Sequence, residues 1–157
     1  MNISGLSTDI FFIAAIKSNK NLMEVIAAHD IYNNVANPDY DMDNVALPYI
    51  IVNNDGGNNN LMSKDEEYEG DEDKVNISIR IVAKTRKQLD DIATDVRRTV
   101  NQYIREMDSL IEAGEEPDGY ELKPSDYTFS FSDISYDMLK PSHTIMLYYN
   151  CDVTNKQ

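Results

Sequence analysis

The chain has little of what several common classes of protein require. Its 157 residues include one cysteine, Cys151, and two histidines, His29 and His143. One cysteine cannot form an internal disulfide, and such scarcity is typical of proteins in a reducing compartment. The histidines lie far apart in the sequence without a partner at ligand spacing, so the sequence predicts no zinc site. Cys151 alternates with Tyr149 and Val153, which favours a small buried side chain over a nucleophile.

Basic residues and long apolar runs are scarce as well. There are 14 lysines and arginines against 28 acidic residues, and the formal net charge is -14. Proteins that neutralise nucleic-acid phosphates carry a basic face, so this balance argues against that function and against docking on an anionic membrane. No apolar run approaches the roughly 20 residues of a membrane helix. The N-terminus has no basic region before its apolar patch, so we expect no signal peptide.

What the chain does have is periodic apolar sequence. Hydrophobic residues make up 41% of it, enough to bury a core in a single predicted domain, residues 1–157. The patterns predict helices at 8–17, 21–28 and 85–111, and strands at 29–35, 48–53, 75–83, 127–135 and 143–153. Consecutive strands without crossover helices favour antiparallel pairing. The predicted fold class is α+β: an antiparallel or mixed sheet, a long amphipathic helix on one face, short N-terminal helices and a long acidic hairpin loop.

The clearest patterns belong to the long helix and to two strands. Apolar residues recur along the helix at spacings of three and four, and Thr85 and Gln88 form a T-x-x-Q capping-box pattern at its start. The predicted buried helix face is Leu89, Ile92, Ala93, Val96, Val100, Tyr103, Ile104 and Met107. In the strands, alternation predicts one buried face each. These faces are Val75, Ile77, Ile79, Ile81 and Ala83, and Ile145, Leu147, Tyr149, Cys151 and Val153.

Weaker patterns complete the chain. Leu22, Val25 and Ile26 are spaced as the apolar face of the second helix. Gly114 is a natural stop for the long helix, and residues 115–126 read as a loop. The tyrosines Tyr127, Tyr136, Tyr148 and Tyr149 suit either a protein interface or the core.

The least core-like stretch is NNDGGNNNLMSKDEEYEGDED, residues 53–73, between two predicted strands. Its last nine residues carry seven carboxylates. Like charges at this density keep a segment solvated, and loops beyond about 12–15 residues are usually functional or disordered. We interpret the stretch as a flexible hairpin tip used in assembly, with NDGGN as a turn. The residues assigned to an oligomer interface or a lumen are Leu61, Met62, Asp65, Glu66, Glu67, Tyr68, Glu69, Asp71, Glu72 and Asp73.

A second acidic stretch has the spacing of a calcium loop at Asp39, Asp41 and Asp43. An EF-hand would require glycine and glutamate where Asn44 and Ile50 stand, so we interpret this stretch as a turn. The sequence contains no catalytic constellation, and it predicts no metal and no cofactor.

The patterns also follow a familiar order. Two short helices and IYNNV precede LPYIIV; a long loop, VNISIRIVAKTRKQLDDIATDVRRTV and a closing HTIMLYYNCDVT come after it. This order resembles the tail-terminator, or tail-completion, proteins of tailed bacteriophages. The likeness spans most of residues 8 to 153 and rests on element order and on the PYIIV and helix patterns, without an invariant chemical motif. The chain departs from the smaller members in the length of 53–73 and 115–126.

The resemblance implies a non-enzymatic virion protein, a ring-forming tail terminator or neck connector at the head–tail junction. It implies a homo-oligomeric ring, a hexamer or alternatively a twelvefold ring, beside tail-tube or neck and portal proteins. DNA would pass through without specific binding, and no membrane is involved. The implied location is the virion tail or neck, and the host cytoplasm during assembly. Two alternatives stay open: a monomeric acidic adaptor that mimics nucleic acid, and a metal-dependent enzyme using carboxylates of 39–43 and 65–73.

Overall fold

The computed structural model describes residues 8–27, 30–33, 47–59, 70–112, 120–135 and 142–156. The elements in these ranges are α1 (Thr8–Lys17), α2 (Lys20–Val25), β1 (Ile31–Asn33), β2 (Tyr49–Asn59), β3 (Gly70–Ala83), α3 (Arg86–Glu112), β4 (Tyr120–Ser135) and β5 (Ser142–Lys156). Their order is the predicted one, two helices, three strands, a long helix and two strands. The α+β fold class is confirmed.

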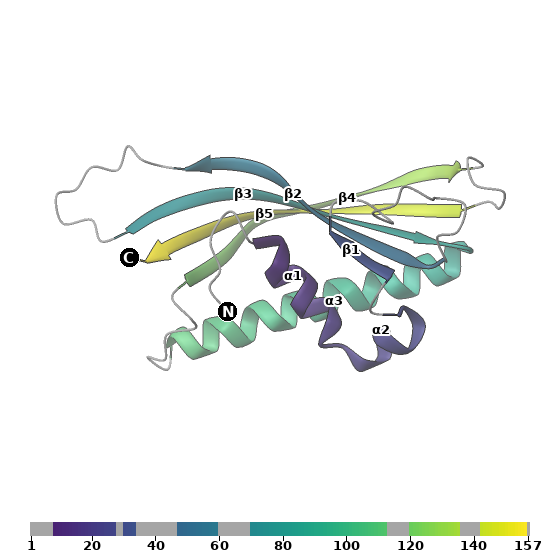
Figure 1. Cartoon of the computed structure of the whole chain (residues 1–157), viewed down its shortest axis with the longest axis horizontal. Helices are drawn as coiled ribbons and strands as arrows, with labels where there is room; N and C mark the ends of the chain where they lie inside the picture. Colours follow the sequence, from purple (N-terminus) through teal and green to yellow (C-terminus); the bar gives the residue numbers. More distant parts are fainter. Residues whose placement is uncertain are drawn as a thin grey trace.

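The described strands form one five-stranded mixed sheet in the order β1-β2-β3-β5-β4. The pairs β2–β3 and β4–β5 are antiparallel, as chain neighbours without crossover helices should be. Strand β3 also pairs antiparallel with β5, although α3 and β4 lie between them in the sequence. The short β1 pairs parallel with β2, with Ile31 opposite Ile50, and this pairing makes the sheet mixed. Figure 1 shows the three helices on one face of the twisted sheet.

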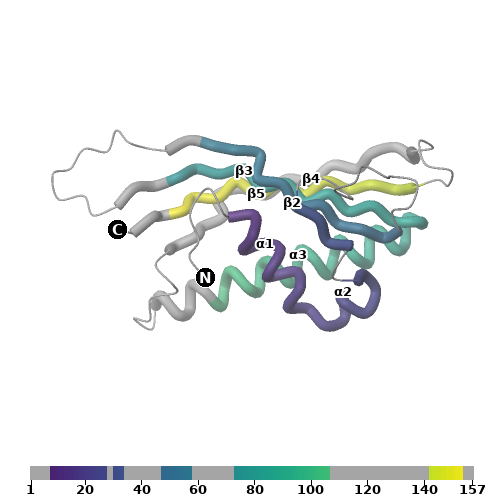
Figure 2. The backbone as a smooth tube through the Cα atoms, in the orientation of Figure 1, coloured from purple at the N-terminus to yellow at the C-terminus, as the bar shows by residue number. Residues whose placement is uncertain are grey.

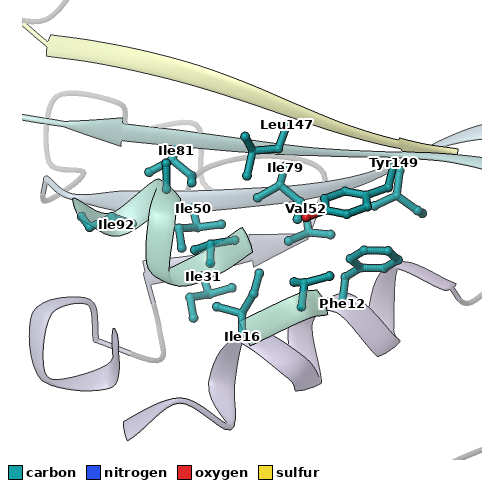
Figure 3. Packing of buried hydrophobic residues seen from close by; sticks show 14 of the residues in the cluster. Phe12, Ile16, Ile31, Ile50, Val52, Ile79, Ile81, Ile92, Leu147 and Tyr149 are labelled. Carbon is teal, nitrogen blue, oxygen red and sulfur yellow. The ribbon is translucent and has the colours of Figure 1, made fainter. Parts of the chain in front are cut away.

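The core fills the space between the sheet and the helices. The alternating residues predicted to be buried in β3 and β5 are all buried, and so are those of the α3 face except Tyr103, which is half-buried, and Met107, whose side chain lies outside the described residues. In Figure 3, Ile79, Ile81 and Leu147 point from the sheet toward the helices, and Ile92 faces them from α3. Period 2 in the strands and period 3.6 in the helix therefore converge on one apolar layer.

Helix α1 is apolar on two sides because it contacts both α3 and the sheet. The Phe11 ring packs edge-on against Tyr103 of α3, with centroids 5.3 Å apart. The centroids of the neighbouring Phe12 ring and the Tyr149 ring of β5 are 5.2 Å apart, and Figure 3 shows the two rings side by side. Among the large apolar residues of α1, only Ile10 is exposed, at 48%.

Helix α2 is shorter than predicted, and one residue of its predicted apolar face is misassigned. Leu22 and Ile26 are buried, but Val25 is 51% exposed. The helix ends at Val25, and the Ile26 backbone is extended. At 100° per residue Val25 is turned about 60° away from the buried Leu22, and Ile26 is buried from an extended backbone.

The capping box of α3 forms with one change of partner. The Gln88 backbone N–H donates to Thr85 Oγ1 at 3.1 Å, as the pattern predicts. Gln88 Oε1 accepts from the Lys84 backbone N–H, also at 3.1 Å, instead of from Thr85. The α3 start is therefore fixed one residue from its predicted position, at Arg86.

The NDGGN sequence is a bulge inside β2, which corrects the prediction of a turn. Partners in β3 shift register between Asn54 and Gly57. Asn54 Oδ1 accepts from the Gly56 backbone N–H at 3.0 Å, and Gly56 has a φ of 91°. A Cβ on Gly57 would overlap the Lys74 carbonyl. Gly56 is required for its left-handed backbone, and Gly57 for the close approach of the Lys74 carbonyl. With glycine at both positions, the strand continues through the bulge to Asn59.

Strand β4 corrects the prediction of a loop over 115–126, because it begins at Tyr120. The segment from Tyr120 pairs with the end of β5, and a register shift lies between Pro124 and Asp126. Proline has no N–H to donate, so it is tolerated on edge strands and at bulges. The position of Gly114, the predicted helix stop, lies outside the described residues.

Candidate assembly surfaces

The first surface is the end of the β2–β3 hairpin beyond Val75, the last buried apolar residue of β3. We call this end of the two strands the arm. Pairing between the two strands reaches Asn59 opposite Asp73, and β3 stays paired with β5 as far as Gly70 opposite Lys156. Figure 1 shows these ends together at one extremity of the sheet, beside the C-terminus. The predicted hairpin is confirmed, but strands occupy 53–59 and 70–73, which were predicted as loop.

The residues assigned to assembly fall into two groups. Leu61, Met62, Asp65, Glu66, Glu67, Tyr68 and Glu69 lie outside the described residues. Asp71, Glu72 and Asp73 are in β3, at positions that continue its alternation. Asp73 is half-buried and opposite Val153, two residues beyond the buried Val75. In β3 the buried apolar residues therefore end at Val75, whereas β5 stays buried as far as Val153.

The second surface is the outer face of α3, which sequence reasoning missed. Three arginines and three neutral polar residues there line a hollow of about 500 Å³. They are Thr94, Arg97, Arg98, Asn101, Gln102 and Arg105. Residues 96–105 contain these three arginines and no carboxylate. We call this surface the arginine face; it is a local concentration of positive charge on a chain of net charge -14.

Helical geometry turns the arginine face away from the sheet. Val96, Val100 and Ile104 are buried on the side of α3 that faces the sheet. At 100° per residue, Arg98 and Arg105 are on the opposite side of the helix. All three arginines are exposed. Within α3, Arg98 has Asp95 at 3.9 Å, an exposed pair that contributes little to stability.

The connection between α1 and α2 is hydrogen-bonded to α3 next to the arginine face. Asn19 Nδ2 donates to Thr99 Oγ1 at 2.7 Å, and the Thr99 hydroxyl donates to the Asp95 carbonyl at 2.7 Å. The same Asn19 caps α2 by accepting from the Asn21 and Leu22 backbone N–H groups. A second hollow of about 400 Å³ lies along this seam and includes Lys20.

The sheet face opposite the helices carries a small apolar cluster at one end. Tyr49, Ile51 and Val82 are buried there, with Tyr32 and Leu47 half-buried beside them. Burial raises the pKa of the Tyr49 phenol. For Tyr32, burial and the nearby Asp30 raise the pKa, and the Tyr32 hydroxyl donates to Asp30 Oδ1 at 3.3 Å. Both phenols therefore stay neutral at physiological pH.

The residues considered for chemistry are structural or undescribed. Cys151 is buried, as predicted, and its burial raises the thiol pKa to about 12, with Asp152 adding to the shift. A thiol held in this protonated form is a poor nucleophile. His143 is half-buried at the start of β5, and His29 and Asp39 to Asn44 lie outside the described residues. Over the described ranges, no group of three histidine, cysteine or acidic side chains is arranged to hold a metal.

The structure describes the side chains of two tyrosines of the predicted cluster, one buried and one exposed. Tyr149 is 1% exposed and belongs to the core, whereas Tyr148 is 37% exposed on the opposite face of β5. The Tyr127 side chain and all of Tyr136 lie outside what the structure describes.

No protein-family model and no curated protein matches this chain. None of the described helices is both long and apolar enough to cross a bilayer.

Proposed function

We propose that the chain is a ring-forming structural protein of a bacteriophage virion, a tail terminator or neck connector at the head–tail junction. The observation that carries the proposal is the β2–β3 arm, whose paired strands continue past Val75, the last buried apolar residue of β3, toward the acidic segment. A two-layer body whose sheet ends in a long paired hairpin offers backbone and side chains for contact with a neighbouring subunit. The element order, which resembles that of tail-terminator proteins, supports the same function.

The charge supports this proposal through a physical argument. A conduit for DNA works better when its wall does not bind the polyanion. A net charge of -14 repeated around a ring gives a wall that repels phosphates. The proposed ring is a hexamer, with twelvefold symmetry as the alternative, and its neighbours are tail-tube or neck and portal proteins.

The mass of the chain in solution tests the ring. We expect light scattering after size exclusion to give a closed oligomer, six or twelve times the 17.9 kDa subunit mass, that dissociates on dilution. An open series of increasing masses would indicate a filament instead of a ring. A mass of one subunit at every concentration would contradict the proposal and favour the monomeric acidic adaptor.

A further inference from the structure

We infer that Asp55 and Gly56 form a site of spontaneous covalent modification, at which the aspartate isomerises to isoaspartate. An aspartate that precedes glycine is especially prone to this reaction, because glycine has no side chain to hinder attack by its own backbone nitrogen. The reaction requires a peptide unit that is accessible to water and is not held between paired strands. Both conditions are met at this pair.

The pair lies outside the hydrogen-bond ladder of the sheet. The register of β2 with β3 shifts between Asn54 and Gly57. It assigns no β3 partner to Asp55 or to Gly56. On the other side of β2, the described part of β1 pairs only as far as Val52. Figure 2 shows the sharp bend in the tube of β2 that a bulge produces. Neither described neighbour of β2 therefore holds the peptide unit between the two residues.

The pair is also accessible. Both residues are exposed, and a Cβ built on Gly56 would meet no atom within 4 Å. The Gly56 backbone N–H donates to Asn54 Oδ1 at 3.0 Å, and this bond is exposed as well. Rotation of one exposed side chain releases the nitrogen for reaction, whereas a nitrogen between paired strands is released only when the strands open.

The reaction balances within the chain and one water molecule. The Gly56 nitrogen attacks Cγ of Asp55, a C–N bond forms, and a carboxyl oxygen leaves with the proton of the nitrogen as part of water. The product is a five-membered succinimide ring. Water then adds to one of the two ring carbonyls and breaks its C–N bond. Opening at the backbone carbonyl leaves the main chain running through Cβ and Cγ, which is isoaspartate, and opening at Cγ restores aspartate. Nothing is oxidised or reduced.

The modification acts on the arm, and this consequence rests on the proposed function. Isoaspartate adds one atom to the β2 backbone at the bulge, where no pairing has to break. Residues Gly57 to Asn59 then shift relative to their partners in β3. We expect the modified chain to stay folded and to form fewer rings, as light scattering of modified and unmodified fractions would show. Equal assembly of the two fractions would contradict this effect on the arm.

Ageing of the folded chain at neutral pH and physiological temperature tests the site. Peptide mapping with an isoaspartyl methyltransferase as the probe should find isoaspartate at position 55, together with a succinimide that is lighter by one water molecule. Mapping is needed because a second Asp–Gly pair, Asp118–Gly119, lies outside the described residues. The matched control is Asp55→Glu, which keeps the charge but would have to close a less favourable six-membered ring. It should give no signal at position 55.

A second variant tests the role of the bulge. Asn58→Asp with Asn59→Gly places the same dipeptide in the paired part of β2. We expect isoaspartate to form at position 58 roughly 10-fold more slowly than at position 55, because the strands must first open. Equal rates at the two positions would overturn the inference, as would an unmodified position 55 after a period that modifies the unfolded chain. Modification of a chain that forms no ring would leave the inference intact and contradict the proposed function, and a ring that never modifies would do the reverse.

Discussion

Replacement of Val96 by aspartate is expected to abolish the cooperative folded state. Val96 has no exposed surface and packs within the layer between α3 and the sheet. A carboxylate there is removed from water, and the apolar cluster offers it no partner. Burial of an unpaired charge costs several kcal/mol, which is comparable with the whole stability of a typical domain, about 5–15 kcal/mol. Circular dichroism during thermal unfolding would measure the loss.

A matched variant shows whether the loss of stability comes from burial of the carboxylate or from aspartate itself. Thr94→Asp introduces the same side chain two residues away at an exposed position, and it should change stability by about 0.5 kcal/mol or less. Ile92→Ala, which leaves a cavity without a charge, should cost about 2–5 kcal/mol. Unchanged melting of Ile92→Ala would mean that the sheet side of α3 is misassigned.

Removal of residues 61–69 is expected to keep the fold intact and to abolish assembly. The deletion joins Asn60 to Gly70, a turn-prone pair, so that four residues connect the opposed Asn59 and Asp73. Changing the length of a loop has a small entropic effect, so the melting temperature should hardly change. The deletion removes all the large apolar groups of the acidic stretch and four of its seven carboxylates. Light scattering should then give a single-subunit mass.

A length-matched replacement shows whether assembly depends on the side chains of residues 61–69 or on the length of this segment. Nine glycine and serine residues in place of 61–69 restore the length without the charges and the apolar groups. If the acidic segment makes the contact, this chain should also fail to assemble. Normal assembly by both variants would contradict the role of the arm, and failure of both to fold would contradict the placement of residues 61–69 at a hairpin tip.

The buried faces were predictable because their periodicity follows directly from the fold. Ile77 and Ile79 alternate as a strand requires, and Ile92 and Val96 recur as a helix requires. The start of β4 was not predictable in this way. Its polar residues gain their structure from hydrogen bonds to β5, and the Pro124 signal favoured a loop. The bulge at Gly57 was missed for a similar reason, since the need for glycine arises from the Lys74 carbonyl across the sheet.

The candidate surfaces were predictable in part. The hairpin followed from two strand patterns on either side of an acidic stretch, because neither strand is stable without a partner. The arginine face could have been found from the same helical spacing that identified the core. Arg98 and Arg105 are seven residues apart, hence on one side of a helix, and that side is opposite Val96. The net charge of the whole chain, -14, gives no sign of this local concentration of arginines.

Electron microscopy of virus particles, with gold label directed to this chain, tests the central claim most directly. A ring component of the neck or tail should be found on every intact particle, at one fixed position on the tail axis. The account predicts label at the head–tail junction or at the end of the tail tube. Particles that carry no label, from infected cells that contain the chain, would contradict it.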